Sequence, residues 1–226
     1  MPGLLYIVSV PIGNAGDITP RAADVLGLVD FVAAENPRTT QKLLHSLNLQ
    51  KPIIQHHPHS AQHRSEDILA RIAAGESCAL CSDAGTPAIS DPGEALVADA
   101  IALGIRVVPV PGTTAAMAAL SVSGQSTSRF VFEGFLPRSL NRRREHLAML
   151  QEEPRTILLY EAHRKLLPTL RDLAAVLGAE RSITICFELT KPNERIIKTT
   201  LADALPAFAA DVPEGEYVLV IAGKSG

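Results

Sequence analysis

The sequence has few cysteines and no long apolar run, and both scarcities limit what the protein can be. Only 3 cysteines occur in 226 residues, too few for the disulfide framework of a small secreted domain. No apolar stretch reaches the ~18 residues that a membrane-spanning helix needs. The N-terminus also lacks the basic-then-apolar pattern of a signal peptide. We therefore expect a soluble, cytoplasmic protein that does not enter membranes.

Cys78 and Cys81 have C-x-x-C spacing, but they fall within a predicted strand. Residues three apart on a strand point to opposite faces, so we expect buried structural thiols instead of a zinc or redox pair. The histidines of residues 56–63 (His56, His57, His59 and His63) are crowded enough to suggest metal binding. Nothing near them resembles a second half-site for zinc, and we predict no metal.

Motifs for common nucleotide cofactors are absent as well. No G-x-G-x-x-G follows the first predicted strand and no G-x-x-x-x-G-K-[ST] occurs, which argues against an NAD enzyme or a P-loop NTPase. The formal net charge of −3 gives no overall attraction to nucleic acid. Any contact with RNA has to come from a local basic patch.

The sequence does contain a regular alternation of strands and helices. Short apolar runs predict strands at 4–10, 30–34, 52–55, 77–80 and 105–110, each followed by a helical pattern. This rhythm predicts an α/β protein with a mostly parallel N-terminal sheet covered by helices on both sides. The small, polar stretch 124–128 predicts a linker, so we place two domains at 1–123 and 124–226, the second with a mixed sheet.

In the second half the predicted strands are 130–135, 156–160, 183–187, 194–199 and 217–222. Residues 136–144 are expected to form a basic loop before a helix at 145–150, with further helices at 166–177 and 201–210.

The stretch Ser82 to Gly93, S-D-A-G-T-P-A-I-S-D-P-G, is the least ordinary part of the chain. It is longer than the roughly 2–6 residues of most strand-to-helix loops in α/β units. Its prolines fix φ while its glycines allow close backbone approach, and loops at the carboxyl ends of strands bind ligands in this fold class. With loops 11–17, 35–40 and 111–114 it offers hydroxyls, carboxylates and backbone groups, which suits holding a reactive cofactor.

A second group of polar residues lies in the second half. Four arginines form the only dense basic run, which is either a solvated helix start or a contact for RNA phosphates: Arg138, Arg142, Arg143 and Arg144. Arg38, Arg164, Lys165 and Lys191 could extend it. Four residues that follow strands are acid–base or orienting candidates, with plain surface roles as the alternative: Glu161, His163, Glu188 and Lys191.

Seven motifs occur in order along nearly the whole chain: V-x-x-P-I-G-N at 8–14, A-A-E at 33–35, the 82–93 stretch, P-G-T-T-A-A at 111–116, F-x-F-E-G-F-L-P at 130–137, Y-E-x-H-R at 160–164 and E-L-T-K at 188–191. Together they resemble the bacterial ribosomal RNA small-subunit methyltransferase I group of the tetrapyrrole methylase superfamily. The resemblance implies two α/β domains with S-adenosylmethionine in a cleft between them, and a homodimer. It also implies methylation of a cytidine ribose 2′-oxygen in small-subunit (16S) ribosomal RNA.

By motif position, the resemblance places eight residues near the cofactor: Pro11, Asp83, Thr86, Pro87, Ile89, Thr114, Ala115 and Tyr160. A ribose hydroxyl is weakly acidic, so a base or a cation near it would help its methylation. We assign these catalytic roles to Glu35 or Glu188 as the carboxylate, and to Arg38 or Lys191 as the cation.

The chain departs from the family pattern in three places. It reads A-A-E-N-P-R at 33–38 where the family usually has A-A-E-D-T-R, and Y-E-A-H-R at 160–164 where the family usually has Y-E-S-P-H-R. Many relatives also continue beyond the last predicted strand. Two alternatives therefore stay open: a methyltransferase of the same fold for a small, tetrapyrrole-type molecule, and a cofactor-binding homologue without catalysis.

Overall fold

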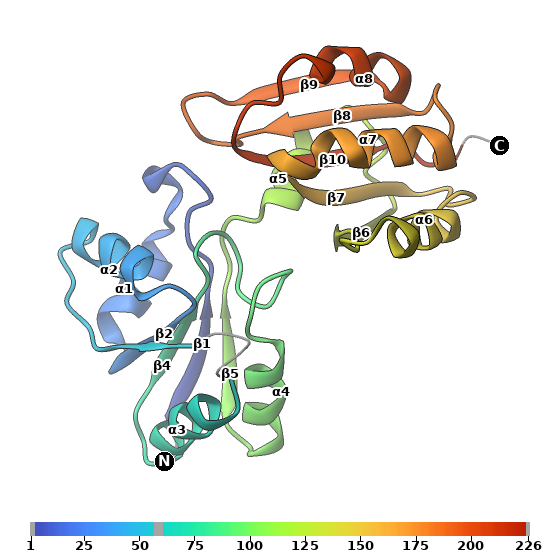
Figure 1. Ribbon diagram of the computed structural model, residues 1–226. Coiled ribbons are helices and arrows are strands. Elements are labelled where there is room, and N and C mark those ends of the chain that lie inside the picture. Colours follow the sequence, from blue (N-terminus) through green and yellow to red (C-terminus); the bar gives the residue numbers. More distant parts are fainter. Residues whose placement is uncertain (1–2, 57–60, 225–226) are drawn as a thin grey trace. The chain divides into compact units, whose positions relative to one another are not determined.

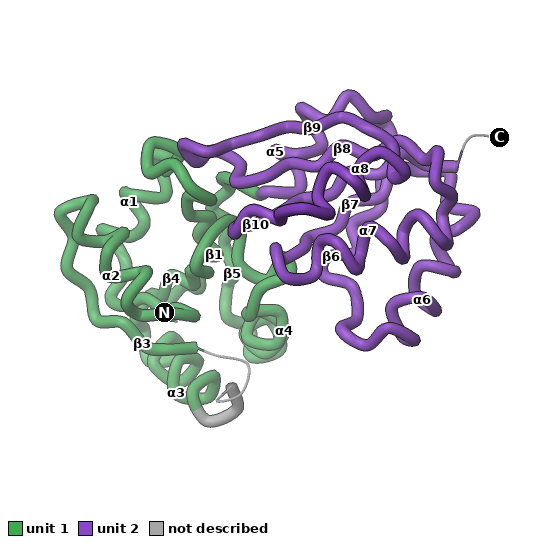
Figure 2. Tube along the Cα trace, turned by 45° about the horizontal axis from the view of Figure 1, so that its top comes forward, with its two compact units in different colours: residues 1–114 green, residues 115–226 purple. Residues whose placement is uncertain are grey.

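The computed structural model (Figure 1) describes residues 3–56 and 61–224, leaving out the side chains of 61–63. The backbone forms two compact units, residues 1–114 and 115–226 (Figure 2). The division therefore falls before helix α5 (Ala115–Val122), whereas the sequence placed it after residue 123. The reason is that α5 packs against strands β7 and β10 of the second unit.

The sheet of the first unit has the strand order β3-β2-β4-β1-β5, and every neighbouring pair is parallel. This confirms the predicted parallel sheet. A parallel arrangement brings the carboxyl ends of all its strands to one edge, which is where the four polar loops leave. The strands are β1 (Leu4–Val8), β2 (Phe31–Ala34), β3 (Ile53–Gln55), β4 (Cys78–Cys81) and β5 (Arg106–Val110).

Helices cover both faces of this sheet (Figure 1). On one face Leu26 of α1 and Leu44 of α2 pack with Val8, and on the other Ile68 of α3 and Leu96 of α4 pack with Leu5. The helical elements are η1 (Ala15–Asp17), α1 (Pro20–Leu28), α2 (Pro37–Ser46), α3 (Ala61–Ala73) and α4 (Glu94–Ala102). As predicted, the Thr19 side chain caps α1 and Pro20 is its first residue.

The two cysteines of β4 confirm the expectation of structural thiols. Cys78 belongs to the core on the α3 and α4 side, and Cys81 belongs to the core on the α1 and α2 side. Both are buried and free, and burial raises the pKa of Cys81 to about 12. Neither thiol is suited to redox or metal chemistry at neutral pH.

The second unit contains the predicted mixed sheet, with strand order β6-β7-β10-β8-β9. β6 runs parallel to β7, whereas β10 is antiparallel to both β7 and β8. Helices α6, α7 and α8 share one core with the sheet, and α5 lies at the other face, where Thr184 donates a hydrogen bond to the Ser123 carbonyl. The elements are β6 (Phe130–Phe135), α6 (Leu140–Met149), β7 (Thr156–Ala162), α7 (His163–Leu177), β8 (Ser182–Phe187), β9 (Arg195–Thr200), α8 (Leu201–Ala209) and β10 (Glu216–Ile221).

The basic run lies in α6, so the prediction of a loop over residues 136–144 was wrong for its second part. The Ser139 side chain caps the helix by accepting from the Arg142 amide. Helical spacing then turns Arg143 inward, where its Nε donates to Asp172 of α7 at 2.7 Å. Arg144 donates to the other oxygen of the same carboxylate at 2.8 Å. Asp172 therefore ties α6 to α7.

Replacing Asp172 by alanine should destabilise the second unit strongly. The side chains of Arg143 and Asp172 are only 7% and 4% exposed, and Asp172→Ala would leave the buried guanidinium without its carboxylate. We expect the free energy of unfolding, measured by urea denaturation, to fall by about 3–5 kcal/mol. As the control, Glu152→Ala breaks the exposed pair with Lys224 and should cost below about 1 kcal/mol. Equal losses in the two variants would show that Asp172 has no such role.

Candidate active site

The loops that leave the carboxyl edge of the first sheet are hydrogen-bonded to one another. Val10, just beyond β1, and Gly85, in the loop after β4, exchange both backbone hydrogen bonds at 2.9 and 3.0 Å. Gly85 has φ +77°, and a Cβ there would lie 3.4 Å from Ile12, so a glycine suits this close crossing of two loops. The loops after β1 and β4 are thus joined through their backbones.

A chain of hydroxyl groups extends this connection to the loop after β5. The Thr86 hydroxyl donates to the Thr113 carbonyl at 2.9 Å, and the Thr113 hydroxyl donates to the Val10 carbonyl at 2.6 Å. Because the single proton of Thr86 is used in this way, the Ser9 hydroxyl donates to Thr86 across their 2.8 Å contact. Three loops are therefore held by side chains as well as by backbone.

The loop after β2 joins the same group through Asn36 and Asp83. The Asn36 side-chain oxygen accepts from the Arg38 amide at 3.1 Å and caps α2, with Pro37 as its first residue. Its NH₂ group and its backbone amide donate to the Asp83 carboxylate. Partial desolvation raises the pKa of Asp83, and the two hydrogen bonds from Asn36 oppose that shift. The side chain of an aspartate at position 36 would cap the helix equally but could not donate to Asp83.

The other residues predicted in the first unit lie around this group. Pro11 directly follows the Val10 crossing, Pro87 is buried beside Thr86, and Thr114 is half-buried next to Thr113. Ile89 exposes 46% of its surface. Glu35 is half-buried at the end of β2, and Arg38 is exposed on the first turn of α2.

In the second unit, Tyr160 and the start of α5 lie together. The Tyr160 hydroxyl accepts a hydrogen bond of 3.1 Å from the Ala116 amide, next to Ala115. The Tyr160 ring makes edge contacts with Phe132 and Phe135, with centroids 5.0 and 5.6 Å apart. Two predicted cofactor neighbours, Ala115 and Tyr160, are thus brought close to each other.

Glu188 and Lys191 form a network with Glu216. The Lys191 ammonium donates to both carboxylates at 2.9 Å, and Glu188 also accepts from the Glu216 amide. Burial acts to raise the pKa of Glu188, but these hydrogen bonds outweigh it and leave the pKa lowered. For Lys191, burial acts to lower the pKa and the two carboxylates outweigh it, leaving the pKa raised. Both groups are therefore charged at neutral pH, which favours a fixed cation at Lys191 over a base at Glu188.

The basic run divides into two kinds of residue. Arg143 is buried and paired with Asp172, which conflicts with its predicted contact with RNA, and Arg144 shares the same carboxylate. Arg138 and Arg142 are exposed. Glu161 is also committed to the fold, since its carboxylate accepts from the Ala162 amide and from Thr169.

Sequence reasoning missed several residues of these networks. Ser9 was not singled out, and Thr113 was noted only as part of the P-G-T-T-A-A motif, although the hydroxyls of both residues join the loops. Asn36 was noted only as a departure, although an Asn-Pro pair before a helical pattern is an N-cap signal. Asp172 lies 28 residues from Arg144, and only the packing of α6 on α7 shows that they pair.

The part of the chain that the structure describes contains no group of three or more histidine, cysteine, aspartate or glutamate residues that could hold a metal ion. His56 is buried, burial lowers its pKa, and its Nε2 lies 3.2 Å from the Ser65 hydroxyl. His57, His59 and the side chain of His63 are outside the described residues. No helix in the described ranges is both long and apolar enough to cross a membrane.

Comparison with known proteins identifies the family. Residues 4–205 match the model of the tetrapyrrole (corrin/porphyrin) methylases. The chain belongs to this family. Within the family it is 50% identical to the ribosomal RNA small subunit methyltransferase I of Synechocystis sp., over 99% of this chain and 80% of that protein. It is 46% identical to the protein of the same name from Pseudomonas aeruginosa, over 98% and 79% of the two chains. It is therefore a tetrapyrrole methylase of the small-subunit methyltransferase I group.

Solved structures of tetrapyrrole methylases and related enzymes share the fold. The methyltransferase CobJ superposes with a TM-score of 0.72 at 17% identity, covering 99% of this chain and 97% of that chain. Diphthine synthase gives 0.73 at 15% identity, covering 97% and 90%. At these identities the likeness concerns the fold alone, and it confirms the predicted two-part α/β architecture.

The network around Glu188 should make the stability of this methylase depend on pH in the acidic range. A carboxylate with a lowered folded pKa stabilises the fold fully above its ordinary value of 4.5, and that contribution is lost as pH falls through the folded value. Glu188→Gln should therefore reduce the decline in unfolding free energy measured by urea denaturation from pH 5 down to pH 3. Glu214→Gln, at an exposed residue, is the control. An unchanged slope in Glu188→Gln would contradict the assignment.

Proposed function

We propose that the protein transfers a methyl group from S-adenosylmethionine to the 2′-oxygen of a cytidine ribose in small-subunit (16S) ribosomal RNA. The observation that carries the proposal is 50% identity over nearly the whole chain to a protein named for methylation of small-subunit ribosomal RNA. The protein would act in the cytoplasm, where that RNA is found, and as a homodimer like the group that its motifs resemble.

The loops of the first unit fit such a cofactor. S-adenosylmethionine presents an ammonium group, a sulfonium, ribose hydroxyls and an adenine ring. Asp83 offers a carboxylate to the cationic or hydroxyl groups, and Ile89 offers an exposed apolar surface to the ring. At Gly112 a Cβ would come within 2.8 Å of the Ser9 side chain, so the third loop needs a glycine to lie this close to the first. We assign cofactor binding to these loops, with Tyr160 and Ala115 as further neighbours.

The chemistry asked of the protein is modest. The cofactor supplies the reactive methyl group when bound, and the acceptor oxygen must be held at about 3 Å in line with the bond that breaks. Lys191, held by two carboxylates, can stabilise negative charge on the ribose oxygen, with Glu188 as its positioning residue. Glu35 and Arg38 are our candidates for accepting the proton and for additional positive charge. Asn36 and Pro37 have structural roles in the same loop. This departure from the family pattern therefore leaves the carboxylate and cation candidates of the loop, Glu35 and Arg38, in place.

Calorimetric titration with S-adenosylmethionine tests the cofactor site. We expect one site per chain for the wild type and at least tenfold weaker binding for Thr86→Val. This substitution keeps the shape of the side chain but leaves Ser9 and the Thr113 carbonyl without their partner, a loss of about 1–3 kcal/mol. Thr127→Val, at an exposed threonine of the second unit, should bind as the wild type does. Wild-type affinity in Thr86→Val would remove these loops from the site.

Transfer of a radiolabelled methyl group tests the acceptor. Ribosomal RNA from a strain that lacks this methylation should accept label, and nuclease mapping should place the label on a cytidine ribose. Lys191→Ala should lower turnover by about ten- to a hundredfold while leaving cofactor affinity unchanged, and Lys42→Ala, at an exposed lysine of α2, should alter neither.

Two results would overturn the proposed reaction. Labelling of a tetrapyrrole but not of RNA would favour the small-molecule alternative. Tight cofactor binding with no methyl transfer to any of these acceptors would favour a homologue without catalysis.

A further inference from the structure

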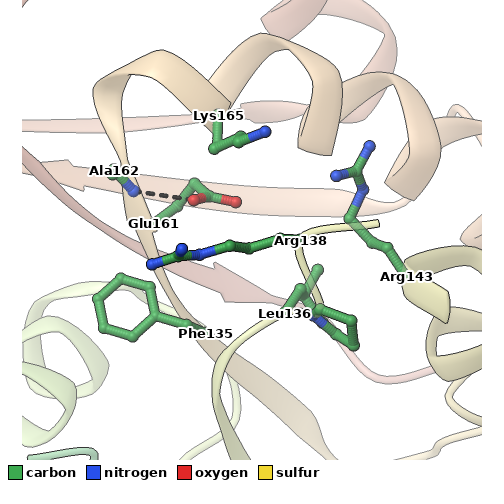
Figure 3. A pocket seen from close by; sticks show the side chains of 8 residues that line it. Phe135, Leu136, Arg138, Arg143, Glu161, Ala162 and Lys165 are labelled. Carbon is green, nitrogen blue, oxygen red and sulfur yellow. Dashed lines mark hydrogen bonds between the residues drawn. The ribbon is translucent and has the colours of Figure 1, made fainter. Parts of the chain in front are cut away.

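Two cations of the second unit line a pocket without a partner of their own. The pocket has a volume of about 330 Å³ and lies where the segment after β6 meets the start of α7 (Figure 3). The side chains of Arg138 and Lys165 point into it. Neither makes a hydrogen bond or an ion pair with any residue in the described ranges, so both are available to a ligand.

The remaining charges of the pocket are already committed. Arg143 is held by Asp172, which it shares with Arg144, and Glu161 accepts from Thr169 at 2.5 Å and from the Ala162 amide at 2.9 Å. Three cations (Arg138, Arg143 and Lys165) and one carboxylate (Glu161) line the pocket, and the carboxylate of Asp172 pairs with Arg143. The pocket therefore attracts an anion, and the excess comes from the two cations without a partner.

The start of α7 adds to this positive character. The N-cap residue Ala162 lines the pocket and makes no side-chain capping hydrogen bond. The first amides of this 15-residue helix carry the positive end of its dipole. The helix terminus, Arg138 and Lys165 therefore all favour a negatively charged group.

An exposed aromatic ring forms another part of the pocket wall. Phe135 leaves 59% of its surface exposed and makes an edge contact with Tyr160, whose ring plane is inclined at 63°. An exposed ring beside unpaired cations is the combination that binds a single-stranded nucleotide, because the ring stacks on a base and the cations bind its phosphate.

We infer that this pocket binds one unstacked nucleotide of the RNA substrate, with its phosphate at Arg138 and Lys165 and its base against Phe135. The inference rests on the proposed function for the identity of the RNA. A pocket of about 330 Å³ lies at the small end of the range for ligand sites and suits one nucleotide better than a four-ring tetrapyrrole. The contact of Phe135 with Tyr160 places the nucleotide next to a residue that we assign to the cofactor.

RNA binding by the full chain, measured by fluorescence anisotropy at several salt concentrations, tests the inference. The probe is a fluorescent fragment of small-subunit ribosomal RNA. Arg138→Ala with Lys165→Ala should weaken binding about tenfold or more and lower the slope of log affinity against log salt by about 0.7–0.9, the value for one phosphate contact. Phe135→Leu keeps an apolar side chain without a ring and should weaken binding by about fivefold or more without changing the slope.

Arg171→Ala is the matched control, since Arg171 is an exposed arginine of α7 that does not line the pocket. It removes a charge of the same kind and should leave both affinity and slope nearly unchanged. Because Arg138 and Lys165 have no described partners, their variants should melt at the wild-type temperature and bind S-adenosylmethionine as the wild type does.

The outcomes separate this inference from the proposed function. If the wild type methylates ribosomal RNA but the pocket variants bind it no more weakly than Arg171→Ala, the pocket is not the nucleotide site and the function stands. If the pocket variants lose affinity and slope but no methyl transfer to RNA is found, the site stands and the proposed reaction fails. A wild type that binds no RNA, or pocket variants that lose binding of anionic tetrapyrroles only, would overturn the inference.

Discussion

The two backbone hydrogen bonds between Val10 and Gly85 are the contact on which the candidate cofactor site depends. They join the loop after β1 to the loop after β4, two neighbouring strands of a parallel sheet. Once that crossing is made, Ser9 lies within reach of Thr86, and Thr86 within reach of the Thr113 carbonyl. Backbone hydrogen bonds thus join the first two loops, and the hydroxyl groups of Thr86 and Thr113 attach the loop after β5 to them. A site built in this way is preorganised by the sheet instead of by the ligand.

In the second unit a single carboxylate has the comparable role. Asp172 binds both Arg143 and Arg144, which fixes α6 on α7. Arg143 is thereby buried, whereas Arg144 stays exposed with its charge paired. Arg138 and Lys165 remain beside the start of α7, where they line a small pocket. The basic run of the sequence therefore has two parts. Arg143 and Arg144 are paired with Asp172, and Arg138 and Arg142 are exposed.

Much of this fold follows from the sequence because its signals are local. Short apolar runs identified the strands of the first sheet, Thr19-Pro20 marked the start of a helix, and Gly178 marked the end of another. Parallel pairing then follows from the alternation of strands and helices, and with it the edge where the loops gather. The placement of Thr86 and Asp83 near the cofactor comes from the family motifs and stays a prediction.

The features that the sequence could not predict depend on interactions between distant residues. The helical period that starts at Ser139 turns Arg143 inward, but nothing near Arg143 in the sequence reveals Asp172. Likewise, nothing near Glu188 in the sequence shows that its carboxylate accepts from the Glu216 amide. Glu216 begins β10, and its own carboxylate accepts from Lys191. The structure divides the chain before α5 and not after it. The small apolar residues of α5 could pack on either sheet, so the sequence does not show to which unit the helix belongs. In each case the deciding partner lies far along the chain, where residue type and spacing carry no information.

The buried cysteines of β4 have a consequence for the behaviour of the protein in solution. Cys78 and Cys81 lie in different cores on the two sides of one strand, and burial holds both thiols in the protonated form. Alkylating reagents and oxidants react with thiolates, so these side chains become reactive only when the central strand of the first sheet separates from its neighbours. The rate at which the thiols become modified thus reports the opening of the sheet from which the candidate cofactor loops extend.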